Sequence, residues 1–141
     1  MKKILFIGLI GLFFSTVSCS QTSQMKAIEK TITAFSKAGD TNNSLELAKY
    51  LDDNYRIVMN RLFGSKEVSV MSKSLYLEKI ETKEFGGDTR ELIISNVVVN
   101  GSTASAKVVF KGKKATFVSL MTLIQNEDGT WKLISDVPIF S

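Results

Sequence analysis

Asp136 is the side chain in this sequence with the clearest capacity for acid–base chemistry. It lies in an apolar segment beside Ile134, where burial would raise the pKa of the carboxyl group and make it a general base. Alternation along an extended strand gives a different interpretation, because it places Asp136 on the same face as Lys132, turned toward solvent. We favour the solvated position and keep the buried base as the alternative.

Three aromatic residues could line a binding cavity together with Asp136. Tyr55, Tyr76 and Trp131 each carry a large apolar ring and one polar atom, a combination that suits ligand pockets. Packing in the hydrophobic core is the other role open to all three, and it is the role that we favour for Trp131. The predicted ligand-binding residues are Tyr55, Tyr76, Trp131 and Asp136.

The composition excludes several kinds of catalytic and metal site. The chain has no histidine and a single cysteine, Cys19, so it lacks Ser-His-Asp and Cys-His arrangements and the commonest zinc ligand. Gly86-Gly87 lacks the spacing of a phosphate-binding loop. Asp52 and Asp53 are adjacent and would point apart, which favours a turn over a catalytic pair. We therefore predict no catalytic residue, no metal and no cofactor.

The N-terminal segment has the three parts of a secretion signal. Lys2 and Lys3 precede an apolar run from Ile4 to Phe14, and small residues then lead to Cys19. The run is too short for a membrane-spanning helix, which takes about 20 apolar residues. Ser18-Cys19 resembles a bacterial lipobox, in which cleavage just before the cysteine is followed by acylation of that cysteine.

This segment predicts an exported protein whose first mature residue carries lipid. The predicted organisation is a signal peptide at 1–18, a lipidated Cys19 with a short tether at 19–24, and one domain at 25–141. No acidic cluster follows Cys19, so we expect an anchor in the cell envelope that faces the periplasm. Thr16 stands where a lipobox usually has leucine, which keeps a soluble secreted form open. Loss of the two signal lysines lowers the net charge from +4 to +2, and no nucleic-acid partner is expected.

The mature sequence predicts two helices, a hairpin, a third helix and a four-stranded meander. Apolar residues at three- and four-residue steps predict a helix at 24–38. Asn43 with Glu46 forms a capping box for a second helix that reaches Leu51, and Ser72 or Ser74 would cap the third. Strands are predicted at 55–61, 67–71, 92–99, 102–110, 115–125 and 131–140. This order indicates an α+β fold with a mainly antiparallel sheet.

The strand predicted at 115–125 is apolar on both of its faces. Phe117, Met121 and Leu123 share one face, whereas Leu120 and Ile124 lie on the other. A sheet with one face in water should alternate more cleanly. Either a partner covers the outer face or the strand is central in a strongly curled sheet. We hypothesise a homodimer through the outer sheet face.

Four short motifs carry a resemblance to a known family: Ala38-Gly39-Asp40, Leu51-Asp52-Asp53, Ser74-Leu75-Tyr76-Leu77, and the run from Asp128 to Ile134. Together with the order of elements, they resemble the nuclear transport factor 2-like superfamily over about residues 25–140, and within it the putative lumazine-binding branch. The resemblance implies a cone-like fold, in which three N-terminal helices pack on a curved sheet with a cavity between. Members of the superfamily include enzymes, small-molecule binders and protein-binding modules.

The catalytic residues of enzymes in this superfamily are not matched here. Its steroid isomerases use a tyrosine on the first helix and an aspartate on the first strand, and the matching positions fall near Ile32 and Val58. Its hydratase-like and cyclase-like members use histidines, often just after the tryptophan of the last strand, where this chain has Ser135, Asp136 and Val137.

We therefore expect an exported, lipid-anchored, non-enzymatic domain that binds a small, partly apolar molecule in a cone-shaped cavity. Two alternatives stay open. One is an enzyme of the isomerase or dehydratase type that uses Asp136 with a tyrosine. The other is an envelope module that binds another protein through its outer sheet face.

Overall fold

The computed structural model describes residues 16–140, with side chains described from Ser20 onward. The predicted signal before Thr16 and the side chain of Cys19 lie outside this description. The helices are α1 (Thr16–Asp40), α2 (Ser44–Ala48), the short 3-10 turn η1 (Leu62–Gly64) and α3 (Lys73–Glu81). The strands are β1 (Leu51–Asn60), β2 (Val68–Ser72), β3 (Glu91–Asn100), β4 (Thr103–Lys111), β5 (Thr116–Gln125) and β6 (Trp131–Phe140).

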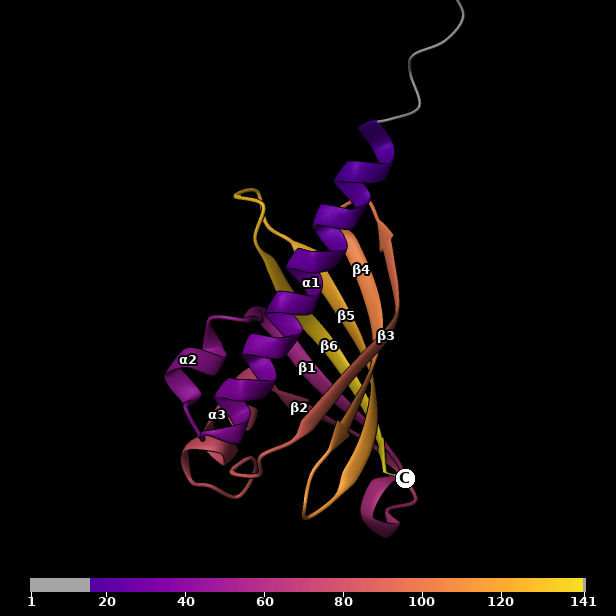
Figure 1. Cartoon of the computed structure of the whole chain (residues 1–141). Helices are drawn as coiled ribbons and strands as arrows, with labels where there is room; N and C mark the ends of the chain where they lie inside the picture. Colours follow the sequence, from indigo (N-terminus) through magenta and orange to yellow (C-terminus); the bar gives the residue numbers. More distant parts are fainter. Residues whose placement is uncertain (1–15, 141) are drawn as a thin grey trace, which may run out of the picture.

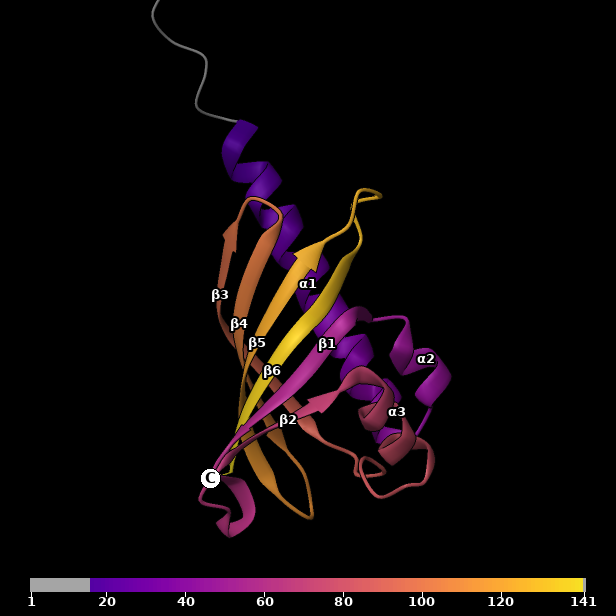
Figure 2. The same cartoon turned by 180° about the vertical axis from the view of Figure 1, so that it is seen from behind.

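One six-stranded sheet forms the main layer, in the order β2-β1-β6-β5-β4-β3. All neighbouring strands are antiparallel except β1 and β6, which run parallel. Figure 1 shows α1 crossing one face of the curved sheet, with α2 and α3 at one end of it, and Figure 2 shows the opposite, uncovered face. This arrangement confirms the predicted α+β, cone-like fold.

The first helix is longer than predicted. It begins at Thr16 instead of residue 24, so the segment interpreted as a tether lies in its first turns. Ile28, Ile32 and Phe35 are buried against the sheet, as the three- and four-residue spacing predicts. Among the described residues, no helix is long and apolar enough to cross a membrane.

Side-chain caps fix the starts of the two shorter helices. The Asn43 side chain accepts a hydrogen bond from the Glu46 backbone N–H at 3.0 Å, and Ser72 caps α3 in the same way. Both caps were predicted, with Ser72 as one of two candidates. The second helix is shorter than predicted, because Leu51 pairs with Leu133 and opens β1. β1 therefore begins inside the core.

The hydrophobic core lies between the helices and the inner face of the sheet. Ala104, Ala106, Val108 and Phe110 on β4 are buried while the residues between them face outward, which confirms the predicted alternation. β5 is an interior strand of the sheet, and its Met121 and Leu123 are buried in the same core.

Asn42 and Gly86 hold the loop after α3 against the end of α1. The Asn42 side chain donates hydrogen bonds to the carbonyl oxygens of Ile80 and Phe85 at 3.0 and 2.6 Å. Gly86 has a φ of +76°, and a Cβ atom added to it would lie 2.3 Å from the Gly39 carbonyl oxygen. Only glycine fits this close approach of two backbones.

Replacing Gly86 by alanine should therefore destabilise the fold by about 3 kcal/mol, because a positive φ and a backbone clash add together. Gly101→Ala provides a matched control, since Gly101 also has a positive φ, +59°, but nothing lies within 4 Å of the added Cβ. The control should lose only about 1 kcal/mol. Urea unfolding of both variants measures the difference, and equal losses would contradict the close-approach argument.

Candidate functional site

A cavity of about 340 Å³ opens between the sheet and the helical layer. Its walls are mostly apolar and come from four strands, α3 and the loop after α3. The apolar lining side chains are Ile57, Met59, Met71, Tyr76, Ile80, Phe85, Ala115, Phe117, Pro138 and Phe140. η1 contributes Leu62 and Phe63, and Phe63 lies against Phe140 with ring centroids 4.9 Å apart.

Asp136 lies at the floor of this cavity. Its side chain is only 6% exposed, so the solvated position that strand alternation favoured is wrong. Asp136 pairs with Met121 on β5 and with Ile57 on β1, and both neighbours face inward. The structure therefore supports the alternative interpretation, a buried carboxyl group.

A β-bulge in β6 is the physical reason for the change of face. Leu133 pairs with Leu123, but the next pair is Ser135 with Thr122, so Ile134 has no partner in β5. One extra residue reverses the alternation, because side chains of a regular strand change face at every step. Leu133 and Asp136 consequently both face the interior although they are three positions apart.

Burial dominates the electrostatics of Asp136. It raises the pKa of the carboxyl group from the ordinary 3.8 to about 7, while the Ser119 hydroxyl and the Arg90 charge act in the opposite sense. Burial, and after it the charge of Asp136, also raises the pKa of the Tyr55 and Tyr76 hydroxyls. The carboxyl group therefore changes its protonation state near neutral pH, and both tyrosines stay protonated.

Four buried side-chain polar atoms have no hydrogen-bond partner among the described residues. They are Asp136 Oδ1, Tyr55 Oη and Ser119 Oγ, and the Trp131 Nε1 atom is a fourth. Ser119 on β5 pairs with Pro138, so it is a diagonal neighbour of Asp136 on β6, and the two side chains form no hydrogen bond. Unsatisfied buried polar groups are uncommon in folded proteins and mark places where a ligand or water can bind.

The four predicted ligand-binding residues separate in the structure. Asp136 and Tyr76 line the cavity. Tyr55 is buried beside Tyr76, with ring centroids 5.9 Å apart, and lines a different pocket on the surface. Trp131 is buried in the core and lines neither of these two pockets.

Arg90 and Asp40 form a half-buried ion pair that the sequence analysis missed. The Arg90 Nε–H donates to Asp40 Oδ1, and its guanidinium carbon lies 4.8 Å from the Phe110 ring centroid. The two side chains are 12% and 15% exposed, and Arg90 lines the cavity. Fifty positions separate the two residues, so no local sequence pattern could have paired them.

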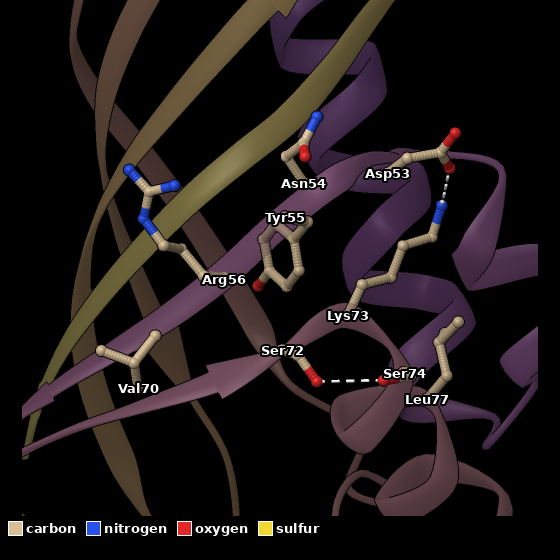
Figure 3. A pocket seen from close by; sticks show the side chains of 9 residues that line it. All are labelled: Asp53, Asn54, Tyr55, Arg56, Val70, Ser72, Lys73, Ser74 and Leu77. Carbon is tan, nitrogen blue, oxygen red and sulfur yellow. Dashed lines mark hydrogen bonds and ion pairs between the residues drawn. The ribbon is translucent and has the colours of Figure 1, made fainter.

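The surface pocket lies where β1, β2 and the start of α3 meet, and it has a volume of about 510 Å³ (Figure 3). β1 loses register with β6 between Leu51 and Arg56, and the residues of this irregular stretch form one side of the pocket. Lys73 binds Asp53 at 2.9 Å, and the Ser72 and Ser74 hydroxyls lie 3.0 Å apart. These four side chains already have partners. The interior cavity holds the unpartnered carboxyl oxygen of Asp136, which makes it the better candidate site.

The arrangement suits binding and proton transfer better than metal chemistry. The residues that the structure describes contain no group of three or more metal-ligating side chains. The cavity instead offers a carboxyl group that titrates near pH 7, one tyrosine hydroxyl and aromatic walls. Such a site can hold a small apolar molecule and exchange a proton with it.

A family model described as "Putative lumazine-binding" matches residues 23–137. No curated protein matches the chain. A nuclear transport factor 2-like protein of unknown function from Shewanella baltica superposes with a TM-score of 0.75 at 15% identity, over 85% of this chain and 95% of its own. A similar protein from Silicibacter pomeroyi gives 0.75 at 17% identity, over 86% and 98%.

A structure described as a putative scytalone dehydratase from Novosphingobium aromaticivorans superposes with a TM-score of 0.67 at 17% identity, over 89% of both chains. At these identities the structural similarity shows a shared fold, because the same fold serves many unrelated activities.

Proposed function

The chain belongs to the "Putative lumazine-binding" family of the nuclear transport factor 2-like superfamily, and we propose that it is a domain that binds a small molecule in its interior cavity. The observation that carries this proposal is the unpartnered carboxyl oxygen of Asp136 at the floor of a largely apolar cavity. Ligand sites typically combine apolar walls with a few polar groups that orient the ligand.

The size and lining of the cavity restrict the ligand. A volume of about 340 Å³ lies at the small end of the range for ligand pockets, so a molecule of one or two rings fits best. Phe85, Phe117 and Phe140 supply aromatic walls, which favour a flat, partly apolar body. Asp136 and the Tyr76 hydroxyl then set its orientation.

Binding of a neutral fluorescent dye tests this proposal. N-phenyl-1-naphthylamine should bind the purified chain saturably, with one dye per protein. Met59→Trp should abolish binding because the new ring fills the cavity, whereas Leu45→Trp adds the same ring at an exposed position on α2 and should not. Circular dichroism checks that both variants are folded. Binding that persists in Met59→Trp, or that is absent from the unmodified chain, would contradict the proposal.

A second candidate function is proton transfer by Asp136. The carboxyl group has a pKa of about 7 in an apolar cavity that Tyr76 also lines, which suits a general base paired with a hydrogen-bond donor. The similarity to a structure described as a putative scytalone dehydratase gives this candidate some support.

Deuterium exchange separates this candidate from simple binding. A bicyclic ketone such as 2-tetralone has acidic protons beside its carbonyl group and fits the size of the cavity. If Asp136 is a base, the chain should accelerate exchange into D₂O at pH 7, and Asp136→Asn should remove about 100-fold of that acceleration. Exchange at the buffer rate with the unmodified chain would leave binding as the function.

We also propose that the protein is exported and held at the envelope membrane by lipid on Cys19, facing the periplasm. The proposal rests on the basic start, the apolar run and the small residues before Cys19. Cys19→Ser should release the protein into the soluble fraction or block its processing, which cell fractionation and mass spectrometry of the mature chain detect. Unchanged membrane association of the serine variant would refute the anchor.

A homodimer through the uncovered sheet face is a further part of this proposal. Leu120, Ile139, Val70 and Val98 are all more than half exposed on outward-facing positions. Leu120 and Ile139 lie on the neighbouring strands β5 and β6, whereas Val70 and Val98 lie on the two edge strands. Exposed apolar side chains on neighbouring strands are a feature of interfaces. Light scattering at tens of micromolar should give a dimer that Leu120→Lys dissociates. A strict monomer at that concentration would contradict it, and a monomer that binds another envelope protein would support the interaction module instead.

A further inference from the structure

The charges that line the cavity are balanced everywhere except at its floor. Arg90 is bound to Asp40, and Glu84 at the mouth is bound to Lys79 with an N–O distance of 2.7 Å. The carboxylate of Asp88 accepts a hydrogen bond from the Lys114 backbone N–H at 3.1 Å. Asp88 and Lys114 both line the mouth and carry opposite charges, so together they add no net charge to the cavity. Asp136 is the remaining charged side chain of the described lining, and it has no ion pair.

The cation that acts on Asp136 does not neutralise it. Arg90 lowers the pKa of Asp136 in part, but its guanidinium donates to Asp40 and to the Ser36 carbonyl oxygen instead. The group formed by Asp40, Arg90 and ionised Asp136 therefore carries one net negative charge. A buried charge without a partner is costly, and one well-placed opposite charge removes much of that cost.

The aromatic walls favour the same kind of ligand. Phe85, Phe117 and Phe140 line the cavity, and the faces of aromatic rings carry negative π-electron density. Two of these rings already have a cation nearby: Lys79 lies 5.4 Å from the Phe85 ring centroid, and Arg90 lies 5.6 Å from that of Phe117. A cation held within about 6 Å of such a face gains additional binding energy, more so where water is excluded. An anionic ligand would be repelled by ionised Asp136.

We propose that the cavity selects flat ligands that present a protonated amine or amidine to Asp136, so that the ligand supplies the positive charge missing from the cavity floor. This inference rests on the proposed function and narrows it to a chemical class. It makes the charge of the ligand, and not its ring system alone, a determinant of recognition. A carboxylate on the same ring system should bind more weakly than an uncharged group.

Three probes of almost identical shape test this inference on the purified full chain: 2-naphthamidine, 2-naphthamide and 2-naphthoate. By calorimetry at pH 8, the amidine should bind about tenfold more tightly than the neutral amide. The naphthoate should bind more weakly than the amide. Asp136→Asn should abolish the preference for the amidine while changing amide affinity by less than about threefold. Glu91→Gln removes the same charge from an exposed position on β3 and should keep the preference.

Proton release gives an independent readout. The groups that face Asp136 are Tyr55 from β1, Tyr76 from α3, Ser119 from β5, and Arg90 from the segment before β3. Both tyrosine hydroxyls stay protonated at pH 7, so amidine binding should release about half a proton from Asp136, and amide binding none. Titrations in two buffers with different ionisation enthalpies measure this number.

The possible outcomes separate the inference from the proposed function. If the amide binds and the amidine binds no more tightly, the charge preference is wrong and the cavity remains a binding site. If the amidine preference survives in Asp136→Asn, the cation binds elsewhere and the inference fails. If none of the three probes binds, the proposed function itself is contradicted, and the inference fails with it.

Discussion

The replacement of Asp136 by asparagine should change the free energy of unfolding in the stabilising direction by about 4 kcal/mol more at pH 8 than at pH 4. The folded carboxyl has a pKa of about 7 against an ordinary 3.8, so between these values the unfolded chain is ionised while the folded chain keeps its proton. The unmodified chain consequently loses stability as the pH rises from 4 to 7, and no more from this group above that range. Asparagine does not titrate and removes this loss.

Urea unfolding at pH 4, 6 and 8 measures this effect, and the difference between the two proteins isolates Asp136 from all other titrating groups. Asp53→Asn is a suitable control, because Lys73 lowers the pKa of that carboxyl and it is almost fully exposed. Its loss should slightly destabilise the protein at high pH, the opposite sign to Asp136. Parallel pH profiles for the unmodified chain and Asp136→Asn would show that the carboxyl is solvated after all.

Removal of Asp40 should produce the second large effect. The Arg90 side chain is only 12% exposed, and Asp40→Asn removes the carboxylate that pairs with it. The substitution should therefore lower the free energy of unfolding by about 3 kcal/mol. The rings of Phe110 and Phe117 still contact Arg90, at 4.8 and 5.6 Å, but they cannot replace a charged partner. Urea unfolding at pH 7 measures the loss.

Two further variants show whether burial of the pair is the cause. Glu84→Gln breaks the more exposed ion pair with Lys79, and it should change stability by less than about 1 kcal/mol. Adding Arg90→Met to Asp40→Asn should recover part of the loss, because an apolar side chain then occupies the site of the stranded charge. Similar effects for Asp40→Asn and Glu84→Gln would show that burial contributes little.

Local patterns predicted the scaffold of the site well. The alternation on β4 and the caps at Asn43 and Ser72 depend on residues only a few positions apart, and all three agree with the structure. The resemblance to the nuclear transport factor 2-like superfamily then implied a cavity between the helices and the sheet. These features follow from sequence because each arises from short-range geometry.

The chemistry of the site was harder to predict, because it depends on contacts between distant segments. Arg90 pairs with a residue fifty positions earlier, and Ser119 approaches Asp136 only through the pairing of β5 with β6. Asp136 was recognised as a candidate but assigned to the wrong face, since alternation alone contains no signal for a bulge. The extra residue at Ile134 becomes evident only when the register with β5 is known.

The bulge in β6 also bears on how relatives of this protein should be aligned. In a relative whose last strand is regular, the residue equivalent to Asp136 would follow the tryptophan by one position fewer than it does here. A sequence pattern with one fixed spacing between the tryptophan and the acidic residue would then miss proteins that place the same carboxyl group at the base of the cavity. It would also group this chain with others whose carboxylate faces water. Alignments across this strand therefore need a one-residue gap, placed by structure, before any acidic position is compared.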